Sequence, residues 1–180
     1  MSCGPEPYSL PLRTAWNGVW GEIPGAVMTG DGTLLNHDTL NWAPWQPKVG
    51  SNDDALEMLR TVTAMRRGPG RNFLVYGRMQ RPAGVSGVKI IQWESNGQKR
   101  AVPAVAHASW QAPDHRYGVV LANWTTESCA VVVAAPKLGK SATLHLSGKK
   151  METSTVEASP DGFHVTLPPL SCALIVGQDH

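Results

Sequence analysis

The sequence lacks the short motifs on which several common activities depend. It contains no GxSxG, HExxH, P-loop or GxGxxG pattern, so nothing in it supports an α/β-hydrolase, a zinc protease or a nucleotide-binding fold. Its three cysteines include no CxxC pair, and no two of its six histidines have the spacing of metal ligands. We therefore predict no cofactor and no metal site.

Charged residues and long apolar runs are also scarce. Charged residues make up 17% of the chain and the net charge is +2, which predicts no nucleic-acid partner. No run approaches the roughly 20 apolar residues that span a bilayer. The first residues have neither the basic start nor the apolar run of a signal peptide. We expect no membrane partner, and the compartment stays open.

Most of the sequence, from Asn72 onward, predicts β structure. Short apolar segments alternate after Asn72 with turn signals such as Pro113-Asp114, and this spacing is typical of an antiparallel β-sandwich. The expected fold class is mainly β: a sandwich of about eight strands over residues 71–180, preceded by one α-helix and an irregular segment rich in Trp and Pro. The expected strands are 73–76, 88–93, 102–110, 116–123, 129–135, 143–147, 153–157, 162–167 and 172–176.

One helix is predicted over residues 52–67. Acidic residues occupy its first turns, and Arg66 and Arg67 its last turn, as the helix dipole favours. Gly68 is expected to end it in a left-handed cap, and Pro69 prevents continuation. The stripe expected to be buried is Leu56, Leu59, Val62 and Met65.

Residues 1–50 are expected to be irregular because prolines interrupt them, yet they hold four of the seven tryptophans. Aromatic faces stack on sugar rings and polar side chains bind hydroxyls, so one interpretation is part of a carbohydrate site. The other is that these tryptophans fill a seam between domains. The candidate carbohydrate-binding residues are Trp16, Trp20, Glu22, Asp31, His37, Asp38, Trp42 and Trp45.

The tryptophans and cysteines of the β part are expected to be structural. Trp93, Trp110 and Trp124 are expected to pack the sandwich. Cys129 and Cys172 lie in apolar, strand-like runs, where free thiols are commonly buried. A disulfide between these two cysteines is the alternative, provided that their strands are neighbours.

Three segments carry a resemblance to a known family: NFLVYGRMQRP (72–82), HASWQAPDHRYGVVLANWT (107–125) and VTLPPLSCALIV (165–176). Together they resemble the C-terminal end of TIM-barrel glycoside hydrolases, in particular a group of poorly characterised bacterial glycoside hydrolase-like proteins. In that group the last barrel helix leads into a small β-sandwich with the patterns W-x-x-x-D-G-x-x-x-V-V-x-x-N and L-P-P-x-S. The chain departs at His115, where Gly is usual. It keeps Trp110, Asp114, Val119, Val120, Asn123, Leu167, Pro168, Pro169 and Ser171.

The resemblance covers residues 52–176 and implies that residues 1–70 are an incomplete barrel end. An intact barrel takes about 250 residues, so a catalytic barrel is expected as a partner in cis or in trans. The catalytic carboxylates of such barrels come from earlier strands, and no catalytic residue is carried over to this chain.

Three functions stay open at this point. The first is a non-catalytic C-terminal part of a carbohydrate-active enzyme, which stabilises the barrel and contacts substrate. The second is a free-standing carbohydrate-binding or structural β-sandwich module. The third is a small hydrolase in which Glu22 and either Asp31 or Asp38 act as acid and base.

Overall fold

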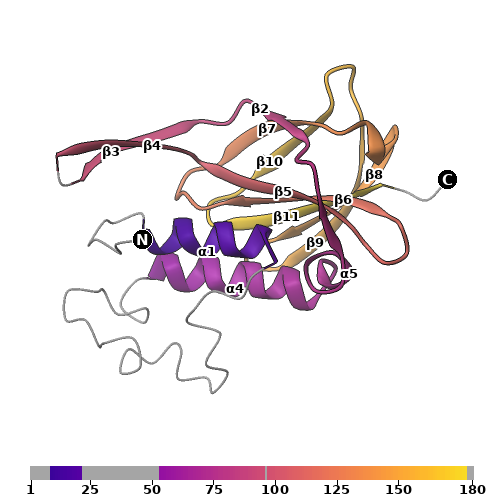
Figure 1. Ribbon diagram of the computed structural model, residues 1–180, viewed down its shortest axis with the longest axis horizontal. Helices are drawn as coiled ribbons and strands as arrows, with labels where there is room; N and C mark the ends of the chain where they lie inside the picture. Colours follow the sequence, from indigo (N-terminus) through magenta and orange to yellow (C-terminus); the bar gives the residue numbers. More distant parts are fainter. Residues whose placement is uncertain (1–8, 22–52, 96, 178–180) are drawn as a thin grey trace.

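The computed structural model describes residues 9–21, 53–95 and 97–177, and Figure 1 shows their arrangement. Within these ranges, three α-helices precede the strands: α1 (Ser9–Val19), α4 (Asp53–Arg67) and the short α5 (Arg71–Leu74). A 3₁₀ turn, η3, covers Pro136–Leu138. The strands are β1 (Arg78–Gln80), β2 (Gly84–Ser86), β3 (Ile90–Ser95), β4 (Gln98–Pro103), β5 (Val105–Gln111), β6 (Tyr117–Asn123), β7 (Cys129–Ala134), β8 (Ser141–Ser147), β9 (Met151–Glu157), β10 (Phe163–Leu167) and β11 (Ser171–Gly177).

The strands form two stacked antiparallel sheets and a separate hairpin. The larger sheet has the order β1-β5-β6-β11-β8-β9, the smaller has the order β10-β7-β2, and β3 pairs with β4 alone. Helices α1 and α4 cover the face of the six-stranded sheet that points away from the three-stranded sheet (Figure 1). The mainly β, antiparallel sandwich expected from the sequence is therefore confirmed.

Two apolar clusters fill the spaces on either side of the six-stranded sheet. Val120 and Leu174 belong to the cluster on the helix side, whereas Val119 and Ile175 belong to the cluster between the sheets. Because the central strands β6 and β11 are covered on both faces, almost every residue in them is buried. This double burial explains why the two segments are continuous apolar runs rather than alternating ones.

Helices α1 and α4 lie side by side and run in the same direction. Gly18 of α1 faces Val62 of α4, and one turn further along, the Arg66 guanidinium donates a hydrogen bond to the Gly21 carbonyl oxygen. Both contacts advance along the two helices together, which only a parallel pair allows. Residues 22–52 therefore join the end of one helix to the start of its parallel neighbour.

The helix predicted over residues 52–67 is confirmed as α4, but the expectation that residues 1–50 are irregular is wrong for α1. Pro11 is the third residue of α1. In the first turn of a helix the backbone N–H groups have no intrahelical partner, so proline is tolerated there. The residues that follow, Thr14 to Val19, contain no proline and bury Ala15 and Val19 completely.

The left-handed cap expected at Gly68 is also wrong. The Gly68 N–H donates to the Ala64 carbonyl oxygen at 2.9 Å, and Gly68 is not among the described glycines with positive φ. The chain stays right-handed through Gly70 (φ −76°) and enters α5. The expectation of a strand over residues 73–76 is therefore wrong, since this segment begins within the helix α5. The helical conformation buries both Phe73 and Leu74 in the helix-side cluster.

Strand boundaries differ from expectation mainly around the hairpin. The single strand expected over residues 102–110 is the end of β4 and the whole of β5, separated at Ala104, whose N–H donates to the Lys89 carbonyl oxygen at 2.8 Å. The three-residue strands β1 and β2 were not expected, since they are too short to show a periodic pattern. The remaining strands lie where the turn signals placed them, with ends shifted by one or two residues.

A disulfide between Cys129 and Cys172 is excluded by the sheet that lies between them. Cys172 belongs to the helix-side cluster and Cys129 to the cluster between the sheets, and both are free and buried. Burial raises the pKa of the Cys172 thiol to about 12, so this thiol is not a nucleophile. The expectation of free, buried thiols is confirmed.

In the β5–β6 turn, His115 occupies the position at which the family pattern has glycine. The His115 N–H donates to the Ala112 carbonyl oxygen at 2.9 Å, and His115 itself adopts φ 70°. Asp114 Oδ1 accepts from the Arg116 backbone N–H at 3.2 Å. His115 therefore takes the left-handed conformation that glycine adopts without strain.

We expect His115→Gly to stabilise the protein by about 0.5–1 kcal/mol, because it removes the cost of a left-handed non-glycine residue. Urea unfolding measures this change. The matched control is Lys149→Gly in the exposed β8–β9 turn, where φ is not positive and glycine adds only flexibility. Equal loss of stability in both variants would contradict the proposed strain.

We expect Gly18→Ala to destabilise the protein by about 1–3 kcal/mol, although alanine normally favours a helix. A Cβ at Gly18 would lie 2.6 Å from Val62 Cγ1, so the two helices would have to separate. Gly148→Ala is the control, since a Cβ there meets nothing within 4 Å. A Gly18→Ala variant as stable as the parent would show that the helices are not in contact.

Candidate functional site

Two of the eight candidate carbohydrate-binding residues, Trp16 and Trp20, lie on α1. Their ring centroids are 5.1 Å apart and the rings are tilted by 55°, so the pair does not form a flat platform. Trp16 is half-buried against the helix-side cluster, whereas Trp20 is 44% exposed. The other six candidates lie outside the described residues: Glu22, Asp31, His37, Asp38, Trp42 and Trp45.

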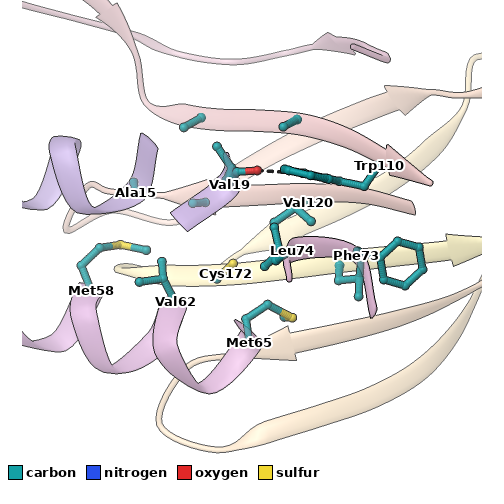
Figure 2. Packing of buried hydrophobic residues seen from close by; sticks show 14 of the residues in the cluster. Ala15, Val19, Met58, Val62, Met65, Phe73, Leu74, Trp110, Val120 and Cys172 are labelled. Carbon is teal, nitrogen blue, oxygen red and sulfur yellow. Dashed lines mark hydrogen bonds between the residues drawn. The ribbon is translucent and has the colours of Figure 1, made fainter. Parts of the chain in front are cut away.

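Trp110 ties the end of α1 to the six-stranded sheet. Its indole Nε1 donates to the Val19 carbonyl oxygen at 2.9 Å, and Figure 2 shows the ring beside Val19 at the end of α1. The last carbonyl groups of a helix lack intrahelical donors, so this bond satisfies one of them. Trp124 is buried as well, and its Nε1 donates to the Pro103 carbonyl oxygen at 2.7 Å. The structural role expected for these two tryptophans is confirmed.

Arg66 joins three elements rather than lying on a solvated helix end. Its guanidinium donates to the carbonyl oxygens of Gly21, after α1, and of Leu74, in α5, the latter at 2.8 Å. Because the bonded groups are the unsatisfied carbonyls of two helix ends, the charge of Arg66 is also favourable there. No sequence pattern identifies this role, since its partners lie 45 and 8 residues away.

A hollow of about 460 Å³ lies beside this junction, lined by Arg66, Arg67, Arg71 and Val75. Arg71 is engaged with Tyr76: Nη2 lies 3.0 Å from the phenol oxygen, and the guanidinium carbon lies 5.5 Å from the ring centroid. The hollow is open to solvent at the C-terminal end of α4. The helix dipole stabilises positively charged side chains at the C-terminal end of a helix, so these arginines do not by themselves indicate a binding site.

The residues that carry the family resemblance form a structural network. Asn123 is fully buried, and its Nδ2 donates to the carbonyl oxygens of Glu127 and Pro168 at 2.7 and 2.8 Å. Ser171 Oγ donates to the same Pro168 oxygen at 2.7 Å. Pro168 and Pro169 have no backbone N–H groups, and the side chains of Asn123 and Ser171 satisfy the carbonyl group of Pro168. The motif therefore specifies architecture and not chemistry.

Three carboxylates of the described residues, in turns and on the surface, have pKa values below their usual range. Hydrogen bonds from Arg116, Lys89 and His164 lower the pKa values of Asp114, Glu127 and Asp161, respectively. All three lie in exposed ion pairs. A glycosidase acid needs a raised pKa so that it is protonated near neutral pH. These three carboxylates are therefore exposed turn and surface residues.

The described part of the chain holds no group of three or more His, Cys, Asp or Glu side chains that would bind a metal ion. Among these residues, no helix is both long enough and apolar enough to cross a membrane.

No family model and no curated protein matches the sequence. Solved structures that are similar in part include the α-amylase from Geobacillus thermoleovorans complexed with acarbose (14% identity, TM-score 0.42, 76% of this chain and 24% of that chain). The GH51 arabinofuranosidase from Xanthomonas axonopodis pv. citri is 15% identical, with a TM-score of 0.39 over 67% of this chain and 26% of that one. A GH30 endoxylanase from Clostridium papyrosolvens C71 is 15% identical, with a TM-score of 0.36 over 46% and 22%. These structural neighbours are glycoside hydrolases, and the matched part is about a quarter of their length.

We expect Trp16→Ala to destabilise the protein by about 2–3 kcal/mol, because it removes a ring packed on the core. Trp20→Ala removes an exposed ring at the same helix and is expected to cost less than about 1 kcal/mol. Urea unfolding of both variants measures the difference. A large cost for Trp20→Ala would mean that this ring belongs to the fold and is not available to a ligand.

Proposed function

We propose that this chain is the non-catalytic C-terminal part of a carbohydrate-active, glycoside hydrolase-like enzyme. Residues 1–70 would supply the end of a β/α barrel, and residues 71–180 the β-sandwich that covers it. The observation that carries the proposal is the parallel contact between α1 and α4, at Gly18 and Val62 and again at Gly21 and Arg66.

Neighbouring helices that follow one another in a chain are usually antiparallel, joined by about 2–8 residues. Parallel neighbours need a connection that returns along the full length of the helix, about 22 Å for the 15 residues of α4. Repeating β/α units meet this requirement, because a strand runs back between successive parallel helices. Residues 22–52 are long enough for such a strand and its loops.

The helix pair is buried not only where α1 and α4 contact each other but also on the side that faces the six-stranded sheet of the sandwich. Ala15 and Val19 of α1 and Met58 and Val62 of α4 are buried in the helix-side cluster together with the sheet (Figure 2). Ser147 Oγ in β8 also donates to the Thr61 carbonyl oxygen at 3.0 Å. Since both helices are fixed to the sheet, the sandwich would stabilise the barrel end to which the helices belong. The sequence resemblance over residues 52–176 supports the same arrangement.

The free-standing carbohydrate-binding module stays as the second proposal. The observation that favours it is the exposed ring of Trp20. Retention of the chain on a polysaccharide, abolished by Trp20→Ala, would support this second proposal over the first.

We expect the 180-residue chain to release no product from aryl glycosides or from soluble xylan, arabinan, β-glucan and starch. The reason is that catalysis requires a paired acid and nucleophile or base, and these are expected on barrel strands that precede this chain. Reducing-sugar release measures the activity. Turnover that is lost in Glu22→Gln, with folding unchanged, would contradict the proposal and support a small hydrolase.

A further inference from the structure

Strand β9 forms one outer edge of the six-stranded sheet, and no other strand of the described chain pairs with it there. It is the last strand in the order β1-β5-β6-β11-β8-β9, and it pairs with β8 along its whole length, from Met151 to Glu157. Among the described residues, no backbone group of residues 151–157 takes part in a hydrogen bond outside this ladder. Six of the seven residues are exposed, so little covers either face of the strand.

The other outer strands of the two stacked sheets carry features that discourage further pairing, and β9 lacks these features. Strands β1 and β2 have three residues each. Strand β10 lies between Pro160 and the Pro168-Pro169 pair. Short edge strands and prolines are among the means by which proteins prevent the edge-to-edge pairing of sheets. By contrast, β9 has seven residues in unbroken register with β8 and contains no proline.

The sequence of β9 is complementary to itself when two copies run antiparallel. A twofold axis through Thr153 sets this residue against its own copy and Met151 against Thr155. The same register sets Lys149, in the β8–β9 turn, against Glu157 of the second copy, and the symmetry repeats this pair at the other end. Opposite charges on directly opposed residues stabilise a pair of strands.

Both charged groups are available for such a pairing. Neither Lys149 nor Glu157 forms an ion pair with another described residue. Glu157 Oε1 accepts a hydrogen bond from Ser141 Oγ at 2.7 Å, which orients the carboxylate and leaves its second oxygen for an ammonium group. Lys149 is exposed.

The neighbouring registers are less favourable. An axis through Glu152 would set this carboxylate against its own copy, and like charges directly opposite each other destabilise a strand pair. An axis through Ser154 would set Glu157 against Met151, so the contact with Lys149 would be lost. The charges therefore favour the register centred on Thr153.

We propose that β9 is a dimerisation edge, at which two copies of this chain join their six-stranded sheets into one antiparallel sheet around a twofold axis through Thr153. Backbone hydrogen bonds between the two β9 strands supply the affinity, as in other cases of strand addition, and the pairs of Lys149 with Glu157 fix the register. Since the axis is perpendicular to the sheet, the helices α1 and α4 of both copies lie on the same face of the joined sheet. This dimer does not depend on the proposed function.

Sedimentation velocity of the 180-residue chain over a range of concentrations tests the dimer. We expect a monomer–dimer equilibrium that Lys149→Glu weakens about tenfold, because one reversed charge turns two attractive pairs into repulsive ones. The double variant Lys149→Glu/Glu157→Lys restores opposite charges and is expected to recover the dimer. Arg81→Glu is the matched control: it makes the same change of net charge at an exposed residue after β1, at the opposite edge of the sheet, and is expected to leave the equilibrium unchanged.

Cysteine cross-linking tests the register. In a Cys3→Ser background, where Cys129 and Cys172 are buried, we expect Thr153→Cys to form a disulfide-linked dimer under mild oxidation. Thr155→Cys is the matched control on the same face of β9, because the two copies of residue 155 would lie about 14 Å apart along the strands.

Urea unfolding verifies that each variant is folded. A chain that is monomeric at every concentration, a dimer that Lys149→Glu does not weaken, or equal cross-linking at residues 153 and 155 would overturn the dimerisation edge. None of these results bears on the proposed function, which the coding DNA upstream tests separately.

Discussion

The close contact of two parallel helices is the constraint on which the rest of the structure depends. At Gly18 the backbone of α1 approaches the Val62 side chain so closely that no Cβ fits between them. Arg66 then fixes the ends of α1 and α5 to α4 through two backbone carbonyl groups. Parallel helices held at this distance present one continuous apolar surface, and the six-stranded sheet covers it.

The six-stranded sheet connects the helices to the three-stranded sheet, because each of its two faces packs against one of these layers. One face packs on helices with Val120, Cys172 and Leu174, and the other packs on the small sheet with Val119 and Ile175. Removing either covering layer would expose central strands that are apolar on both sides. In the described residues, the pair of helices α1 and α4 and the sandwich therefore stabilise each other through the six-stranded sheet.

Local signals in the sequence were sufficient for the regular elements and insufficient for the contacts between them. Capping residues and apolar spacing identified α4, and turn residues such as Pro113-Asp114 separated most strands. The same reasoning missed α1, because prolines in the segment suggested breaks although Pro11 lies in a first turn. It also misassigned residues 73–76, where burial by tertiary packing overrides the strand propensity of a short apolar run. The bond between Trp110 and Val19 spans 91 residues, and no local pattern can indicate such a pairing. For the candidate carbohydrate residues, the sequence identified Trp16 and Trp20 by type but not their tilted geometry.

The coding DNA immediately upstream of the Met1 codon tests the central claim most directly. If the parallel helices are the end of a β/α barrel, the open reading frame, or an adjacent one, should encode about 200 or more residues of alternating strand and helix patterns. Paired carboxylates should follow some of those strands. An in-frame stop codon and a ribosome-binding site directly before Met1, with no barrel encoded nearby, would contradict the claim. The helix pair would then have to be explained as a layer of a self-contained protein.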